Sequence, residues 1–292
     1  MKINIFSWKH FAILPTLLIA LLIIMPLLII FRISFSYADF SMPPFSQIFS
    51  WTSENLLTIK LNMKNYIMII QNAYYAKTFL KSIELGGITT ILCLTLGFAM
   101  AYGIHNAKER FKNILLVFVS LSFWTSFLIR IYAWINLLST HGIVNSILMY
   151  LGIIKLPIHF LGNYYSVVLG LVFCYLPFMI FPIYTNLHKL DKSYIEAAFD
   201  LGASPLKIFW RITIPLTKQG IINGCLLVFT GSISEFIIPE LLGGSDTNMF
   251  GRVIWNEFFI NLDWPIACAL SIVMITFVIL PVFLFQGKAK TS

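Results

Sequence analysis

Four ionisable side chains lie inside, or at the ends of, long apolar segments of this sequence: Glu84, Arg130, Glu235 and Glu240. A charge in the hydrocarbon of a membrane is costly, so ionisable residues at such positions are candidates for a path taken by ions or polar solutes. Aromatic ring faces attract cations, and Trp124 and Tyr132 lie near Arg130 in the sequence. We therefore predict that these six residues contribute to a path for a charged solute.

Several of these residues also have a purely structural interpretation. Glu84 follows Lys81 by three residues and can pair with it on a helix surface. Arg130 can extend toward the outer interface, or it can neutralise Glu84 or Glu235. Trp and Tyr residues near the ends of spans are commonly interface anchors. The residue types alone leave both interpretations open.

The sequence contains no combination of residues typical of an enzyme. The patterns H-E-x-x-H, G-x-S-x-G and C-x-x-C are absent. The nucleotide-binding P-loop is also absent, so we expect that this chain does not itself hydrolyse ATP. The five histidines are scattered at no metal-ligand spacing. We expect no catalytic residue, no metal and no cofactor in this chain.

The composition is typical of a membrane protein. Of the 292 residues, 59% are hydrophobic and only 11% are charged, against about a quarter charged residues in an average soluble domain. Water-soluble globular, disordered and disulfide-rich classes are therefore excluded. The formal net charge of +8 indicates cytoplasmic loops rich in Lys and Arg rather than binding of nucleic acid.

Six segments are long and apolar enough to cross a bilayer as helices, which takes about 20 residues each. They are roughly Phe11–Phe31, Thr78–Ile104, Asn113–Ser139, Tyr164–Leu187, Gln219–Leu242 and Pro265–Gln286. The first is too long for the apolar part of a typical signal peptide, so we expect it to be retained. The predicted fold class is all-α: a polytopic membrane protein with six transmembrane helices, forming one domain over residues 1–292.

Basic residues in the connecting segments predict the orientation. With the N-terminus in the cytoplasm, most Lys and Arg residues fall in cytoplasmic segments, as the positive-inside rule requires. The two short outer loops then contain only Lys155 and Arg252. Both termini are therefore predicted to be cytoplasmic, and Glu84, Arg130 and Glu235 to lie toward the outer half of the membrane.

The cytoplasmic loop between the fourth and fifth spans, roughly His188–Lys218, is too long for a simple connection and is predicted to be structured. Ser193 begins an S-x-x-E capping box, which indicates a helix start. Gly202 is placed for a left-handed C-terminal cap, and Ser204 followed by Pro205 indicates a second start. The pattern predicts two short helices bent at a glycine.

Pro215 is expected to end the second of these helices. On the first helix, Glu196 offers a fixed charge, and the small Ala197 and Ala198 allow another backbone to approach closely. Such a bent pair is suited to docking a partner protein. The alternative is an amphipathic connector on the membrane surface, and the residues alone favour neither.

The loop resembles the EAA loop of permease subunits of ABC importers in Glu196-Ala197-Ala198, in Gly202 after three further residues, and in Ile212-Thr213-Ile214-Pro215 after nine more. The family has Leu where Ile214 stands, a conservative departure. In that family the loop inserts into a cleft on the ATP-hydrolysing subunit. The resemblance implies the type I importer permease (MetI-like) fold, with a coupling loop over residues 188–218.

The resemblance also implies roles for the motif residues. Glu196 would pair with a basic group of the ATPase, Gly202 would set the bend, and Ala197 and Ala198 would allow close packing. The remaining motif positions assigned to coupling are Ile212 and Pro215.

Further stretches between about Phe123 and Ser271 resemble permeases of spermidine/putrescine importers, among them the run Glu235–Phe259. This resemblance implies that the charged path conducts polyamines across a bacterial inner membrane. It implies two ATPase subunits carrying ATP and Mg²⁺, a second permease subunit and an external polyamine-binding protein as partners.

Two alternatives remain at this stage. The first is an ABC importer permease for another small cation or an amino acid. The second is a secondary transporter driven by an ion gradient, which would work without an ATPase and would have no use for a docking loop.

Overall fold

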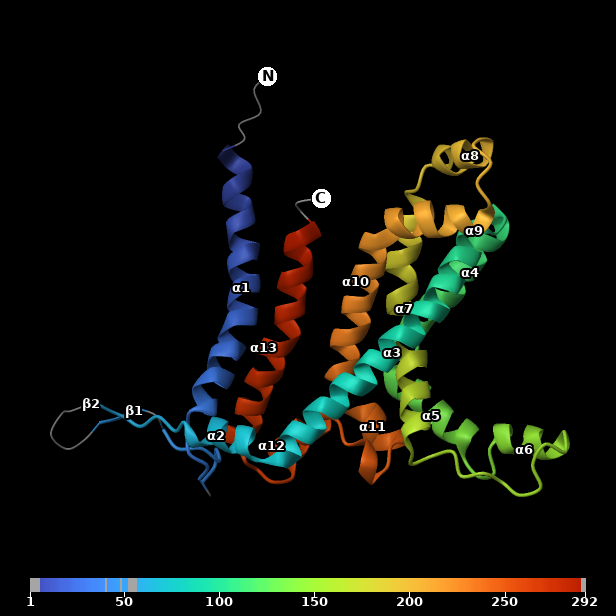
Figure 1. Cartoon of the computed structure of the whole chain (residues 1–292). Coiled ribbons are helices and arrows are strands. Elements are labelled where there is room, and N and C mark those ends of the chain that lie inside the picture. Colours follow the sequence, from blue (N-terminus) through green and yellow to red (C-terminus); the bar gives the residue numbers. More distant parts are fainter. Residues whose placement is uncertain (1–5, 40, 48, 52–56, 290–292) are drawn as a thin grey trace. The chain divides into compact units, whose positions relative to one another are not determined.

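The structure, a computed structural model, describes the whole chain except residues 1–5, 40, 48, 52–56 and 290–292 (Figure 1). It is built almost entirely from helices, with one antiparallel pair of short strands, β1 (Phe49–Trp51) and β2 (Leu57–Ile59). The helices are α1 (Phe6–Ser34), α2 (Lys64–Gln71), α3 (Ala73–Asn106), α4 (Glu109–Trp124), α5 (Phe127–Leu138), α6 (Ile143–Tyr150), α7 (Tyr164–His188), α8 (Lys192–Asp200), α9 (Pro205–Ile208), η1 (a π-helical turn, Phe209–Thr213), α10 (Ile214–Ile233), α11 (Ile237–Leu242), η2 (a 3-10 turn, Ser245–Thr247), α12 (Phe250–Phe259) and α13 (Trp264–Ala289).

The chain divides into two compact units. The first comprises Met1–Ala76 and Ile254–Phe277, and the second comprises Lys77–Val253 and Val278–Ser292. Every residue predicted for the coupling loop or for the solute path belongs to the second unit. In the first unit, the buried amide of Asn65 on α2 donates to the Ser34 and Ser36 carbonyls at 2.9 and 3.0 Å, which ties α2 to the end of α1.

Within the described residues, six helical segments are long and apolar enough to cross a bilayer. The predicted number of spans is therefore confirmed. Helices α1, α3, α7 and α13 contain the predicted first, second, fourth and sixth spans. The third and fifth spans differ from the prediction.

The third predicted span, Asn113–Ser139, is not one helix, because α4 ends at Trp124 and α5 begins at Phe127. Thr125 and Ser126 between them have extended backbones, with ψ of 138° and 137°. The Thr125 hydroxyl donates to the Ser122 carbonyl at 3.2 Å. Such local side-chain bonds compete with the helical ladder, and the continuous apolar pattern of this segment concealed the break.

The fifth span begins and ends earlier than predicted. A continuous helical segment runs from Pro205 to Ile233 through α9, η1 and α10, so the prediction that Pro215 ends the second loop helix is wrong. In η1 the Ile214 amide bonds to the Phe209 carbonyl, a register change that places Pro215 in the first turn of α10. Pro215 has no amide to donate, so one bond of the helical ladder is missing at this point of the continuous segment.

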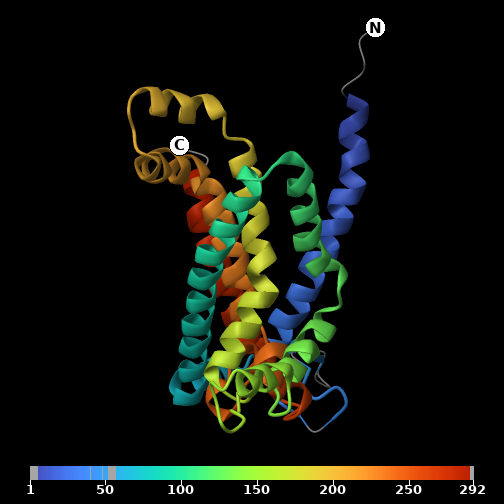
Figure 2. The ribbon, with the colours of Figure 1, turned by 90° about the vertical axis from the view of Figure 1, so that its right-hand side faces the viewer.

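Helices α7 and α10 form the centre of the second unit and lie side by side (Figures 1 and 2). Two glycines of α10 allow this close approach. A Cβ atom on Gly220 would lie 2.6 Å from the Pro182 carbonyl oxygen, and one on Gly224 would lie 2.7 Å from the Met179 sulfur. Small residues at this four-residue spacing are a common means of close helix packing in membranes.

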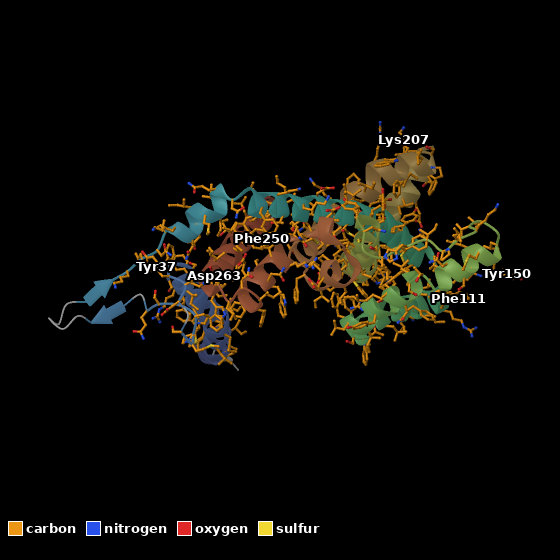
Figure 3. The ribbon with its side chains drawn as sticks, turned by 90° about the horizontal axis from the view of Figure 1, so that it is seen from below. Tyr37, Phe111, Tyr150, Lys207, Phe250 and Asp263 are labelled. Atoms are coloured by element: carbon orange, nitrogen blue, oxygen red, sulfur yellow. The ribbon has the colours of Figure 1, made fainter. Side chains whose placement is uncertain are left out.

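The second unit has two distinct ends. Helices α8 and α9 lie at one end of α7 and α10, whereas α5, α6 and α11 lie at the other (Figure 1). Tyr150, the last residue of α6, is almost fully exposed at that second end (Figure 3). With the predicted orientation, α8 and α9 are cytoplasmic and α11 is extracytoplasmic.

Candidate functional site

The first loop helix, α8, is capped two residues earlier than predicted, by a different side chain. It begins at Lys192, and its N-cap is Asp191, whose carboxylate accepts a hydrogen bond from the Ser193 amide at 3.0 Å. This bond stabilises the charged carboxylate and lowers the pKa of Asp191 below its ordinary value. The prediction that Ser193 is the cap is therefore wrong, because the preceding aspartate takes that position.

The bend between the two loop helices is at the predicted glycine. Gly202 has a φ of +75°, a left-handed conformation that favours glycine. Its amide donates to the Phe199 carbonyl at 2.9 Å, and the Ala203 amide donates to the Ala198 carbonyl at 3.0 Å, which together form a Schellman motif. Ser204 is the N-cap position of α9, with Pro205 in the first turn, as predicted.

The loop exposes large apolar side chains together with the acid Glu196. Glu196 and Ala197 are exposed, whereas Ala198 is buried. The large exposed hydrophobic side chains of the loop include Tyr194, Phe199, Leu201, Leu206 and Trp210. The two alanines therefore lie in different environments, and only Ala197 is available to a partner. Of the two remaining motif residues, Ile212 is half-buried and Pro215 is exposed.

Glu235 lies at the opposite end of the second unit, in the break between α10 and α11, and is only 8% exposed. One carboxylate oxygen accepts from the Phe236 and Ile237 amides at 3.1 and 3.0 Å. The other accepts from the Tyr175 hydroxyl at 2.8 Å. Glu235 therefore holds the first turn of α11, and its charge is met by hydrogen bonds rather than by a cation in the described part of the chain.

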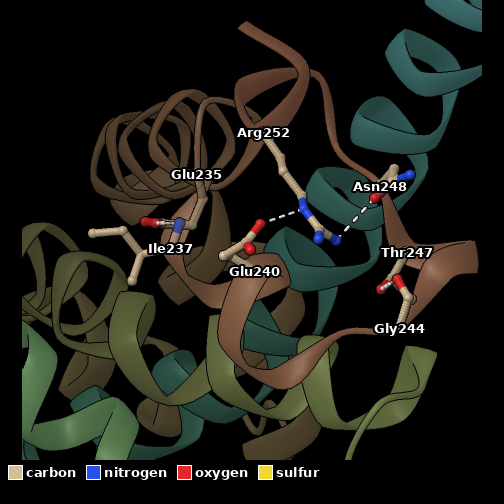
Figure 4. A network of polar contacts seen from close by, with 7 residues as sticks. All are labelled: Glu235, Ile237, Glu240, Gly244, Thr247, Asn248 and Arg252. Carbon is tan, nitrogen blue, oxygen red and sulfur yellow. Dashed lines mark hydrogen bonds and ion pairs between the residues drawn. The ribbon is translucent and has the colours of Figure 1, made fainter. Parts of the chain in front are cut away.

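Glu240 on α11 is half-exposed and forms an ion pair with Arg252 on α12 (Figure 4). The Arg252 guanidinium also donates to the Asn248 side chain at 2.9 Å. This small network closes the loop that follows α11. Glu240 is thus neutralised within the chain, yet it remains open to solvent.

Glu84 on α3 is bonded on both carboxylate oxygens. The Lys81 ammonium lies 3.1 Å from Oε2, and the Tyr164 hydroxyl donates to Oε1 at 3.1 Å. The Lys81 ammonium also lies 4.6 Å from the centroid of the Tyr164 ring. The pairing of Glu84 with Lys81 that the spacing allowed is present.

Arg130 on α5 contacts the Phe127 ring, with its guanidinium carbon 5.6 Å from the ring centroid. Its Nε atom is buried and has no hydrogen-bond partner among the described residues. Trp124 and Tyr132 are 87% and 54% exposed and point away from the core of the unit. Among the described residues, neither ring is recorded in contact with the carboxylates of Glu84, Glu235 or Glu240.

The structure therefore separates the predicted path residues. Glu84, Glu235 and Glu240 each have a different set of partners, and no bond joins one of them to another among the described residues. The sequence reasoning missed Tyr175, the hydroxyl partner of Glu235, and the role of Tyr164 at Glu84. The position of Tyr175 in the middle of an apolar span is a sequence signal for its role, because a buried hydroxyl needs a hydrogen-bond partner.

Comparison with known proteins places the chain in a family. Residues 93–287 match the family described as the binding-protein-dependent transport system inner membrane component. The chain is 36% identical to the spermidine/putrescine transport system permease protein PotB of Haemophilus influenzae, over 98% of this chain and 92% of that protein. It is 40% identical to the protein of the same name from Escherichia coli, over 73% of this chain and 77% of that protein.

Solved structures share the fold. A bacterial alginate ABC transporter, in complex with an alginate pentasaccharide-bound periplasmic protein, matches with a TM-score of 0.70 at 15% identity, over 95% of this chain and 92% of that one. The MetNI methionine ABC transporter matches with a TM-score of 0.57 at 10% identity, over 79% of this chain and 99% of that one. The predicted all-α importer-permease fold is confirmed. This chain is a multi-pass inner-membrane protein and belongs to the family of binding-protein-dependent transport system inner membrane components.

Proposed function

We propose that this chain is the permease subunit of an ATP-driven importer of polyamines, putrescine or spermidine. The observation that carries the proposal is the 36% identity, across 98% of the chain, to a spermidine/putrescine permease. The carboxylates of Glu84, Glu235 and Glu240 at the extracytoplasmic end of the second unit are consistent with a cationic substrate.

The coupling loop, residues 188–218, is proposed to dock into a cleft of the ATPase subunit. Support comes from large exposed apolar side chains of the loop, such as Leu201 at the end of α8 and Trp210 in η1. Exposed Glu196 lies on α8. A basic group of the ATPase would pair with that carboxylate, and the positive-φ turn at Gly202 would fix the angle between the two helices. Movement of the ATPase would then reach the membrane through the continuous helical segment from α9 to α10.

Glu235 is proposed to lie on the substrate path. Its carboxylate is buried and hydrogen-bonded, but no ion pair of it is found in the described residues. A buried negative charge without a counter-ion lowers the barrier for a passing cation. The Nε atom of Arg130 is buried and has no hydrogen-bond partner among the described residues, and the positive charge of Arg130 would disfavour a cation near it.

The assembly is proposed to contain two ATPase subunits, a second permease subunit and an extracytoplasmic polyamine-binding protein. The exposed Trp124 and Tyr132 side chains are consistent with a surface covered by the second permease subunit or by lipid. ATP and Mg²⁺ would bind to the ATPase subunits, and this chain is expected to carry no cofactor of its own.

The proposal is tested by measuring uptake of labelled putrescine and spermidine in a host that lacks its own polyamine importers. The host expresses this chain together with the transporter subunits encoded beside it. ATP-dependent uptake of either polyamine is the expected result. Absence of uptake by an assembled, ATP-hydrolysing complex would overturn the substrate class, and uptake without any ATPase would favour a secondary transporter.

A further inference from the structure

The Lys81 side chain occupies a small site built by two other residues. Its ammonium lies 3.1 Å from a carboxylate oxygen of Glu84 and 4.6 Å from the centroid of the Tyr164 ring. The Tyr164 hydroxyl donates to the second oxygen of the same carboxylate at 3.1 Å. Carboxylate and ring are thereby held together by a bond that does not involve Lys81.

A carboxylate beside an aromatic face is a suitable ligand set for an alkylammonium group. The carboxylate supplies charge and hydrogen-bond acceptors, and the ring face adds a cation–π contact. The Lys81 side chain is itself a primary ammonium on a flexible alkyl stem. The terminal group of a linear polyamine has the same chemistry, so the lysine shows how such a group fits the site.

The site is partly exposed and lies near the helix starts that are predicted to be extracytoplasmic. The side chains of Lys81 and Glu84 are 29% and 49% exposed. Tyr164 is the first residue of α7, and Lys81 and Glu84 lie in the N-terminal part of α3. The positive-inside orientation places both of these helix starts outside the cytoplasm. A solute arriving from outside would meet this site in the outer part of the second and fourth spans.

We propose that Glu84 and Tyr164 form an entry site for a primary alkylammonium group, and that Lys81 occupies it as an intramolecular competitor. This inference rests on the proposed polyamine transport and adds the position of an external substrate contact. An incoming ammonium group displaces the Lys81 ammonium, and the released lysine then repels further cations. The lysine keeps the site filled when no substrate is present.

The competition predicts a modest effect. Exposed ion pairs are favoured over the separated side chains by only a small factor, on the order of two- to fivefold. The apparent dissociation constant for a competing ligand rises as the inverse of the fraction of sites that are free. Removing the ammonium of Lys81 should therefore tighten binding of a small alkylammonium about two- to fivefold.

The test uses the assembled transporter, this chain with its permease and ATPase partners but without the binding protein, in lipid nanodiscs. Equilibrium binding of labelled spermidine and of labelled n-butylamine is measured for wild type, Lys81→Met, Glu84→Gln and the double variant. The matched control is Lys77→Met, because Lys77 is exposed one turn earlier on the same helix and shows no ion pair among the described residues.

We expect Lys81→Met to bind both amines about two- to fivefold more tightly than Lys77→Met, and the double variant to lose this gain. Equal binding by Lys81→Met and Lys77→Met, or a gain that persists in the double variant, would overturn the entry site. Because Lys81→Met removes only the competing ammonium of a partly exposed side chain and keeps an apolar stem, it keeps the test decisive if Glu84→Gln fails to assemble. The proposed function fails separately, through absence of polyamine uptake by the complete wild-type system.

Discussion

Replacing Glu235 by alanine and by glutamine distinguishes the role of its hydrogen bonds in positioning α11 from the role of its charge. In Glu235→Ala the Phe236 and Ile237 amides lose their acceptor, as does the Tyr175 hydroxyl, which keeps only the Gly231 carbonyl at 3.0 Å. A buried donor left without a partner costs about 1–3 kcal/mol. Allowing for partial rehydration of the two amides, we expect a loss of about 2–4 kcal/mol of local stability at the start of α11.

The assay is hydrogen exchange of the backbone amides at the start of α11, measured by mass spectrometry on the assembled transporter. Each 1.4 kcal/mol corresponds to a factor of ten, so exchange in Glu235→Ala should accelerate about 30- to 700-fold. In Glu235→Gln the side-chain oxygen still accepts the two amides, and exchange should stay near wild type. Unchanged exchange in Glu235→Ala would refute the positioning role.

The Gln variant also tests the substrate path. It keeps the geometry of the turn but removes the negative charge, so uptake of polyamine should fall while exchange protection remains. If uptake rate and apparent affinity match those of wild type, Glu235 is a structural anchor only and does not belong to the path.

Three further substitutions probe the loop and the helix packing. Gly202→Ala should destabilise the folded loop by about 1–2 kcal/mol, because a φ of +75° is strained for a residue that has a side chain. The expected observations are faster hydrogen exchange at the end of α8 and weaker coupling of ATP hydrolysis to uptake. The bond from the Ser193 amide lowers the pKa of Asp191 in the folded protein. The charged cap therefore stabilises α8 fully above the unfolded-state pKa of about 3.8. This stabilisation is lost as the pH falls through the lower pKa of the folded state. Exchange protection of α8 should therefore drop below about pH 4 in wild type, whereas Asp191→Asn, which remains a cap without a charge, should show no such drop. Gly224→Leu would collide with Met179, since even a Cβ atom lies 2.7 Å from its sulfur; we expect about 1–3 kcal/mol of destabilisation, seen as a lower melting temperature, and an unchanged melting temperature would contradict the packing of α10 on α7.

Most of the fold follows from patterns that are local in the sequence. The lengths of the apolar runs predict six spans, and four of these agree closely with α1, α3, α7 and α13. The left-handed turn at Gly202 and the start at Pro205 were also predictable, because each depends on the backbone chemistry of a single residue type.

The sequence-based predictions are wrong at positions where contacts with neighbouring structure decide between competing local sequence patterns. Thr125 and Ser126 interrupt the third span although the apolar pattern continues through them. The π-helical turn before Pro215 lets the fifth span continue through a residue that normally ends a helix. Both Asp191 and Ser193 are good capping residues, and only the position of the first turn shows which one caps α8.

The candidate path could be predicted only as a set of residue types. The sequence identifies carboxylates in apolar runs, but their partners lie far along the chain: Tyr175 is bonded to Glu235, and Tyr164 to Glu84. Such pairings depend on which helices are neighbours, which no local pattern contains. The pairing of Glu84 with Lys81 was predictable, because both lie on one helix face.

The most direct test of the account is ATP-dependent uptake of labelled putrescine and spermidine by wild type and by Glu196→Lys, at equal amounts in the membrane. The matched control is Asp200→Lys, which reverses the charge of another exposed acid on α8. We expect uptake by wild type and by the control, and none by Glu196→Lys, because a lysine would repel the basic group proposed to pair with Glu196. Retained ATP-driven uptake by Glu196→Lys would contradict the coupling role of the loop, and absence of polyamine uptake by the assembled wild-type complex would contradict the proposed function.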